Sequence, residues 1–191
     1  EEGYKTISLE ELRLFLSNEM QLPRKSILIT FDDGYKSNVQ YAYPILKKYN
    51  FKAAIFIVSS MICEETSEFD PKMIQFISWE EMEEHSDVFE YACHTHNFHR
   101  LENGKSYLVT KPREELMNDL RMNLETMKNP YFAYPYSEYN SETIKILKEL
   151  GFIMAFSTIS GDVRPGDNMF TLKRRSIRPD MDIEKFKKIL R

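Results

Sequence analysis

Two stretches of this sequence carry side chains that bind and use metal ions. Asp32 and Asp33 stand side by side before a glycine, directly after a short apolar run. Three of the four histidines, His94, His96 and His99, fall within six residues further along the chain. Imidazoles and a carboxylate together bind divalent transition metals and leave coordination positions open for water and substrate. The pattern therefore predicts a metal site in which one aspartate is a ligand and the other meets substrate or water.

These residues also allow a reading without a metal and a different choice of ligands. Asp-Asp-Gly is a favourable turn sequence, and histidines can cluster on a surface by chance. Alternatively, His94 and His96 would face the same way along a strand and form an HxH pair of the amidohydrolase type. That pair needs further ligands late in the chain, and no histidine follows His99. The residue types alone leave open which two histidines bind.

The elements that must position these groups can be predicted from the spacing of apolar residues. We expect strands at 26–31, 53–58, 88–93, 131–134, 152–158 and 169–177. We expect helices at 36–49, 112–127, 141–150 and 181–190, with Ser141 as the cap of the third and Pro44 interrupting the first. A short helix opens at Ser78, where Glu81 completes a capping box. Strands that alternate with helices predict an α/β fold with a parallel sheet, either doubly wound or barrel-like.

Three polar clusters follow predicted strands directly, at 32–34, 94–99 and 135–137. The carboxyl ends of parallel strands meet at one edge of the sheet, where catalytic groups collect. We therefore expect the three clusters to converge on a single site. No Gly-rich phosphate loop is present. Because the sequence contains no flexible linker and no internal repeat, we predict one domain over residues 1–191. We also expect that this domain is cut at its N-terminus from a longer protein.

Composition narrows the classes of partner. The chain has 191 residues and a net charge of −4, which argues against nucleic acid as a partner. Its longest apolar runs are far shorter than the ~18 residues of a membrane span. The basic cluster at 173–178 is read as a solvated edge. Two cysteines cannot make a disulfide framework, and Cys93, next to His94, is expected to be a small buried residue rather than a ligand.

The motifs resemble those of a known family, the NodB-homology polysaccharide deacetylases of carbohydrate esterase family 4, over about residues 3–178. Residues 30–34, TFDDG, match the first motif of that family without a change. The resemblance implies that Asp32 is the general base and that Asp33 is a metal ligand. The second motif usually reads H-(S/T)-x-x-H, whereas here Phe98 takes the last place and the histidine follows at His99. This spacing is similar to the branch acting on poly-β-1,6-N-acetylglucosamine, so the resemblance implies His94 and His99 as ligands.

The third family motif, R-x-P-Y-G, corresponds to residues 133–137, AYPYS. The resemblance implies that the backbone N–H of Tyr136 stabilises the oxyanion. It also implies substrate contacts, for which we predict His96, Tyr134, Pro135 and Arg174. Ala133 replaces the family arginine, so we expect Arg174 or Arg175 to orient Asp32 instead. The final motif, L-x-H, is absent, which leaves His96 or protonated Asp32 to act as the general acid.

The resemblance implies a distorted (β/α) barrel with fewer than eight repeats and an open groove for a polymer. The expected reaction is hydrolysis of the acetamide of N-acetylglucosamine in a polysaccharide, at the cell wall or elsewhere outside the cell. The expected cofactor is Zn²⁺, with Co²⁺, Ni²⁺ or Fe²⁺ as alternatives. Two competing hypotheses are a carbohydrate-binding pseudo-enzyme without turnover and a hydrolase of a small amide or ester.

Overall fold

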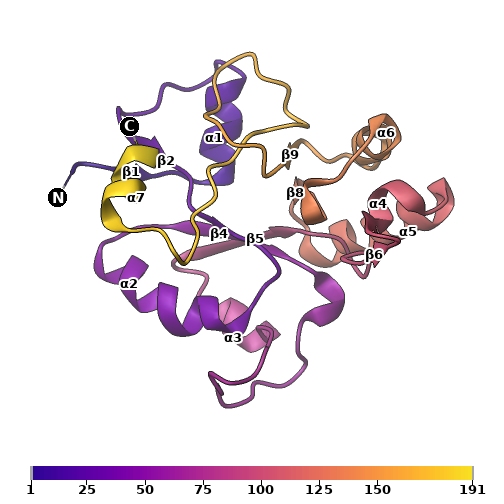
Figure 1. The fold of residues 1–191 in the computed structure, drawn as a ribbon, viewed down its shortest axis with the longest axis horizontal. Helices are drawn as coiled ribbons and strands as arrows, with labels where there is room; N and C mark the ends of the chain where they lie inside the picture. The colour runs from indigo at the N-terminus through magenta and orange to yellow at the C-terminus, as the bar shows by residue number, and fades with distance from the viewer. Residues whose placement is uncertain (1, 191) are drawn as a thin grey trace.

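The fold is built on a sheet of five parallel strands whose order in space follows their order in the chain (Figure 1). A computed structural model describes residues 2–190. The strands are β3 (Thr30–Phe31), β4 (Ala53–Ile57), β5 (Phe89–Cys93), β8 (Tyr131–Ala133) and β9 (Met154–Phe156). Each is reached from the one before by a crossover connection, as parallel pairing requires. The sheet is curled into an open half-barrel, which confirms the predicted barrel with fewer than eight repeats.

Helices and short elements surround this sheet. The helices are α1 (Leu9–Leu16), α2 (Tyr43–Lys48), α3 (Trp79–Glu84), α4 (Tyr107–Thr110), α5 (Arg113–Met127), α6 (Ser141–Leu150) and α7 (Ile183–Ile189). A π-helix η1 (Asn38–Ala42) precedes α2, and the two 3₁₀ turns are η2 (Ser59–Met61) and η3 (Pro135–Ser137). Two small sheets pair β1 (Lys5–Thr6) with β2 (Ser26–Ile27) and β6 (Leu101–Glu102) with β7 (Lys105–Ser106). Within residues 2–190, no helix combines the length and apolar character needed to cross a bilayer.

Helix starts follow the capping chemistry written in the sequence. The Ser78 hydroxyl accepts from the backbone of Glu81, whose carboxylate accepts in return from the Ser78 backbone, so the predicted capping box is confirmed. The cap predicted at Ser141 is wrong by one residue. Asn140 caps α6, because its side-chain oxygen accepts from the backbone N–H groups of Glu142 and Thr143, both at 2.9 Å.

Three predicted elements are broken or absent. The strand expected at 26–31 divides, because residues 26–27 pair with β1 while residues 30–31 pair with β4. The helix expected at 36–49 begins as a π-helix and becomes α-helical around Pro44, which has no N–H to donate. The strand expected at 169–177 is reduced to one bridge, between Leu172 and Phe156. Beyond Leu172 the Arg174 N–H still donates to the Ile159 carbonyl oxygen at 3.0 Å, and the side chains of Arg174 and Arg175 pair with Asp32 and Asp162.

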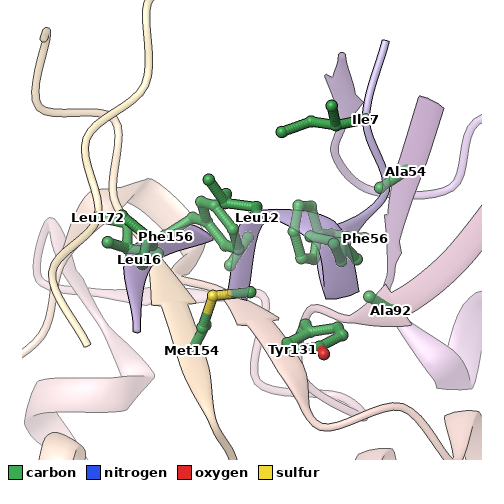
Figure 2. Packing of buried hydrophobic residues seen from close by; sticks show 12 residues of the cluster. Ile7, Leu12, Leu16, Ala54, Phe56, Ala92, Tyr131, Met154, Phe156 and Leu172 are labelled. Carbon is green, nitrogen blue, oxygen red and sulfur yellow. The ribbon is translucent and has the colours of Figure 1, made fainter. Parts of the chain in front are cut away.

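The core lies on both faces of the curled sheet. Figure 2 shows Leu12 and Leu16 of α1 together with Phe56, Met154 and Phe156 of the strands, all of them buried. On the opposite side, α5 and α6 cover β8 and β9, while α2 and α3 cover β4. Burying a large apolar side chain stabilises a fold by about 1.5–3 kcal/mol. The strands are therefore held rigidly, and their ends provide fixed positions for functional groups.

Candidate metal centre and catalytic site

The loops after β3, β5 and β8 contain residues in a backbone conformation that non-glycine residues avoid. Asp33, Thr95, Tyr136 and Ser137 have φ angles of 72°, 74°, 56° and 60°. Such left-handed residues cost roughly 1–2 kcal/mol each and concentrate at functional sites. Beside them, Gly34 has φ 81°, and a Cβ there would lie 2.8 Å from Cδ1 of Ile57. The positive φ therefore favours glycine at this position, and any side chain there would also displace the end of the Ile57 side chain.

Asp33, His94 and His99 converge at these loops. Oδ1 of Asp33 lies 3.3 Å from Nε2 of His94 and 3.1 Å from Nε2 of His99. One potential ligand atom from each residue lies within 4.8 Å of the other two. His94 is buried, whereas Asp33 and His99 are partly exposed, so one side of the cluster faces solvent. Of the titratable side chains in residues 2–190, these three form the group suited to a metal ion.

The donor set fits a divalent cation. Oδ1 of Asp33 is buried and has no hydrogen-bond donor in the structure, although two imidazole nitrogens surround it. A buried carboxylate oxygen without a partner is costly unless a cation or proton satisfies it. Nδ1 of His94 lies 2.7 Å from the carbonyl oxygen of Ala133. When that nitrogen carries the proton, Nε2 keeps its lone pair directed toward Asp33 and His99, as metal-binding histidines require.

The electrostatics of Asp33 favour its ionised form. Burial raises the pKa of this carboxyl, but the adjacent imidazoles of His94 and His99 outweigh that effect and hold the pKa well below its usual value. Burial and the nearby Asp33 carboxylate also raise the pKa of Tyr35, whose side chain borders the site. The ligand oxygen is thus available as an anion at neutral pH.

Tyr136 covers the exposed side of His99. Its hydroxyl lies 3.3 Å from Nδ1 of His99 and donates to the His99 carbonyl oxygen at 3.3 Å. The two rings lie 4.6 Å apart between centroids, and Tyr136 is 45% exposed. The Tyr136 side chain therefore supports a ligand, while its positive φ turns the peptide at the end of β8. Its backbone N–H remains the group that the sequence predicted for the oxyanion.

Asp32 is held by an arginine from the far end of the chain. The Arg174 guanidinium donates to both carboxylate oxygens, with distances of 2.7 and 2.8 Å, and its Nε donates to the Ser157 carbonyl oxygen at 2.9 Å. Burial raises the pKa of Asp32, but Arg174 and, to a smaller extent, His94 bring it below its usual value. Arg175 instead pairs with Asp162. Arg174 is therefore the side chain that orients Asp32, one of the two that the sequence left open.

The loop that carries both histidine ligands is fastened to α5 and η2. The Asp119 carboxylate accepts from the backbone N–H groups of His96 and Asn97, at 2.9 and 2.7 Å. Nδ1 of His96 lies 3.0 Å from the Ser59 hydroxyl, which also accepts from the side-chain amide of Asn123. His96 is therefore directed toward Ser59 and lies outside the three-residue metal cluster.

These supporting residues were missed in the sequence, although one signal was present. Asp119 and Asn123 are polar residues on the buried face of α5, where apolar residues were expected. Burial raises the pKa of Asp119, and the backbone N–H groups that it binds oppose this rise. Polar residues at helical spacing on an otherwise apolar face indicate buried partners, and here the partners belong to the ligand loop.

Two of the predicted substrate contacts lie inside the protein. Tyr134 has no exposed surface; its hydroxyl donates to the Phe170 carbonyl oxygen at 2.9 Å and its ring stacks on Tyr139. Pro135 is buried as well. The structure thus gives both residues a role in shaping the end of β8, with no surface for a polymer.

Cys93 is buried as expected. Its thiol is directed toward the Asn129 carbonyl oxygen, and burial raises the pKa of the thiol.

Comparison with known proteins places this geometry in a family context. A sequence profile of polysaccharide deacetylase matches residues 19–155. The putative polysaccharide deacetylase YxkH of Bacillus subtilis is 32% identical over 94% of this chain, which spans 61% of that protein. The poly-β-1,6-N-acetyl-D-glucosamine N-deacetylase of Staphylococcus aureus strain MSSA476 is 29% identical over 92% of this chain, which spans 62% of that protein. The chain thus spans less than two thirds of the length of these curated relatives.

Solved structures share the fold. IcaB from Ammonifex degensii superposes with a TM-score of 0.85 at 25% identity, over 98% of this chain and 82% of that one. The deacetylase PplD of Streptococcus pyogenes, solved in complex with acetate, also gives a TM-score of 0.85, at 24% identity over all of this chain and 81% of that one. The profile match covers most of the sequence, and its range includes Asp32, Asp33, His94 and His99. This chain belongs to the polysaccharide deacetylase family.

Proposed function

We propose that this chain hydrolyses the acetamide of N-acetylglucosamine residues in a polysaccharide, with Asp32 as the general base. The observation that carries the proposal is the contrast between the adjacent aspartates. Asp33 faces two imidazole nitrogens at 3.1–3.3 Å, whereas Asp32 is paired with Arg174. One carboxylate is thereby suited to coordination and its neighbour to proton transfer.

The proposed substrate is a polymer of N-acetylglucosamine with β-1,6 linkages. The support is the Staphylococcus aureus relative, whose name states this substrate, together with the long spacing between His94 and His99. The partly exposed faces of Asp33 and His99 give an acetamide access from solvent. Action outside the cell or at its surface belongs to the same proposal and stays a prediction.

A divalent cation, with Zn²⁺ proposed first, would be held by Asp33, His94 and His99 and would supply Lewis acidity toward the carbonyl oxygen and water. Asp32 then takes the proton of the attacking water. Arg174 leaves each Asp32 oxygen with a further lone pair, because an ionised carboxylate has about four acceptor sites. The Tyr136 backbone N–H stabilises the charge on the carbonyl oxygen, an effect worth about 3–4 kcal/mol for a well-placed donor.

The departing amine needs a proton, for which His96 and protonated Asp32 are the candidates. The alternative of a pseudo-enzyme rested on two gaps, the missing family arginine and the missing late histidine. Arg174 fills the first gap, since it binds Asp32 with two short hydrogen bonds. The second gap concerns only the acid, and protonated Asp32 can return its proton to the amine. We therefore favour the enzyme over the binding protein.

The proposal is tested by measuring release of primary amine from N-acetylglucosamine oligomers with β-1,6 and β-1,4 linkages. The protein is assayed as purified, after treatment with a chelator, and after addition of Zn²⁺, Co²⁺, Ni²⁺ or Fe²⁺. We expect release from the β-1,6 oligomer that is lost with the chelator and restored by a divalent metal. Binding of the oligomer without any amine release in every metal form would support the pseudo-enzyme instead.

A further inference from the structure

An apolar depression lies beside the metal centre and is not used by the chemistry described above. It has a volume of about 290 Å³, close to the ~300 Å³ at which small-molecule pockets begin. Its walls are formed by Tyr35, Tyr41, Phe69, Met73, Ile74 and Gln75, and we name it the aromatic depression. Tyr41, Met73 and Ile74 are 55%, 63% and 77% exposed. Such an exposed group of large apolar side chains calls for a partner.

The wall of this depression is an ordered loop. The loop, residues 64–76, runs against the segment that follows Asp33, because the Lys36 N–H donates to the Gln75 carbonyl oxygen at 2.8 Å. Tyr35 and Phe76 form a bridge, and their rings stack with centroids 5.3 Å apart. The buried ammonium of Lys36 pairs with Glu81 at 2.7 Å and bonds to the Ser67 carbonyl oxygen.

Side chains inside the loop maintain its shape. The Gln75 amide oxygen accepts from the Asp70 N–H at 2.8 Å, and its nitrogen donates to the Glu68 carbonyl oxygen at 2.9 Å. Phe69 packs edge-on against Tyr41 with ring centroids 5.4 Å apart. The aromatic surface is therefore presented in a fixed orientation before any ligand arrives, which reduces the ordering needed on binding.

Tyr35 connects the depression to the segment of chain that carries Asp33. This residue is two positions from Asp33, lines the depression, and is 36% exposed. A polymer whose acetamide reaches Asp33 must place its neighbouring sugar rings over adjacent surface. The C–H faces of a sugar ring are apolar and its rim is hydroxylated, which matches aromatic walls with the polar Ser37 and Gln75 between them.

The charge of the loop selects among possible partners. Residues 64–76 carry four carboxylates, Glu64, Glu65, Glu68 and Asp70, against one ammonium, Lys72. All four acidic residues are exposed. An acidic loop repels an anionic lipid surface, which basic segments bind. A neutral or amine-bearing sugar polymer has no such conflict, and a glucosamine unit from earlier hydrolysis would be attracted.

We propose that the aromatic depression is a subsite that stacks a hexosamine ring next to the one being hydrolysed, with Tyr41 as its platform. This inference rests on the proposed function, because it assumes that the polymer enters at Asp33. It assigns Tyr41, Phe69 and the loop 64–76 to recognition of chain length. The reacting acetamide itself does not touch them.

The test measures binding and turnover separately. Affinity for a β-1,6-linked N-acetylglucosamine pentamer is measured by calorimetry in the Asp32→Asn protein, with and without Tyr41→Ala, so that the pentamer is not consumed. We expect Tyr41→Ala to weaken binding about 2- to 12-fold, the range of an aromatic contact, and Tyr41→Phe to preserve it. In the active protein the same change should raise KM for the pentamer and leave kcat and the hydrolysis of 4-nitrophenyl acetate unaltered.

Tyr49→Ala is the matched control, because Tyr49 is 60% exposed at the end of α2 and lies outside the depression. Equal pentamer affinity in the Tyr41→Ala and parent proteins would overturn the subsite. Loss of binding to phosphatidylglycerol vesicles in Tyr41→Ala, with pentamer binding unchanged, would assign the surface to a membrane and likewise overturn it. If the wild-type protein releases no amine yet binds the pentamer through Tyr41, the proposed hydrolysis fails and the subsite stands.

Discussion

The two sides of the catalytic site each use one of the two adjacent residues that follow β3, but they are assembled in different ways. The metal side consists of Asp33, His94 and His99, which come from two strand-end loops. The base side consists of Asp32 and Arg174, which are 142 positions apart and meet through a bidentate ion pair. On the metal side a buried oxygen has no donor, whereas on the base side both carboxylate oxygens are satisfied.

This difference explains how neighbouring carboxylates acquire separate roles. An oxygen surrounded by imidazole nitrogens at 3.1–3.3 Å is arranged for a cation. A carboxylate that is already paired with a guanidinium has its charge balanced without a metal cation, and the pair fixes its orientation. The predictions below test whether the two sides are separable, since changes on the metal side should remove the ion and changes on the base side should not.

The largest effect is expected on the metal side. Replacing His99 with Ala leaves two ligands, so we expect loss of stoichiometric metal and of all measurable deacetylation. Metal content is measured by mass spectrometry on protein dialysed against a trace of Zn²⁺. His96→Ala is the matched control, since His96 is directed to Ser59 and should retain the metal. Loss of metal from the His96 variant, with retention in the His99 variant, would reverse the ligand assignment.

On the base side, Asp32→Asn should lower turnover by about 10²–10⁴-fold, the usual contribution of a general base. Metal content should match the wild type, because Asp32 is not a ligand. The fold should be kept but should unfold at a lower temperature, because the amide nitrogen cannot accept a hydrogen bond from Arg174. The measurement combines amine release with metal analysis on the same sample. Turnover near that of the wild type would remove Asp32 from the mechanism and erase the distinction between the two sides.

A smaller loss is expected when the partner of the base is changed. Arg174→Gln removes both hydrogen bonds to Asp32, and loss of such an orienting contact typically lowers activity by about 10–100-fold. Metal content should again be unchanged. Arg175→Gln serves as the control, because Arg175 pairs with Asp162 on the exposed surface. Equal activities in the two arginine variants would show that the guanidinium of Arg174 does not position the base.

The same contrast separates what the sequence could predict from what it could not. The convergence on the metal side was predictable because its residues follow apolar strands, and parallel strands bring their carboxyl ends to one edge. The choice of His94 and His99 over His96 came from the family resemblance and not from the strand pattern. Arg174 was one of two candidates, since a residue beyond the last strand has no periodicity to fix its direction. Tertiary contacts select Arg174, because its Nε donates to the Ser157 carbonyl oxygen and its other nitrogens donate to Asp32.

Local exceptions to the predicted fold also have physical causes. The run at 26–31 is mostly apolar and has no turn residue inside it, so its pattern could not reveal that its two ends pair with different strands. Tyr134 lies in the segment that resembles the third family motif, and that resemblance suggested a substrate contact. Its hydroxyl instead finds the Phe170 carbonyl oxygen inside the core, a long-range pairing that spacing along the chain does not encode.

The smallest effect concerns His96, the residue between the two ligands. Its Nδ1 contacts the Ser59 hydroxyl at 3.0 Å, and its backbone N–H is held by Asp119, so the ring is part of the support of the loop. We therefore expect His96→Ala to retain the metal and to lower turnover less than ~10-fold, below the usual contribution of a general acid. Under this expectation Asp32 returns the proton to the departing amine. A decrease in turnover of about 10²-fold or more, with the metal content unchanged, would identify His96 as the general acid that acts together with Asp32. Steady-state amine release from a β-1,6 oligomer, with metal content measured in parallel, distinguishes the two outcomes.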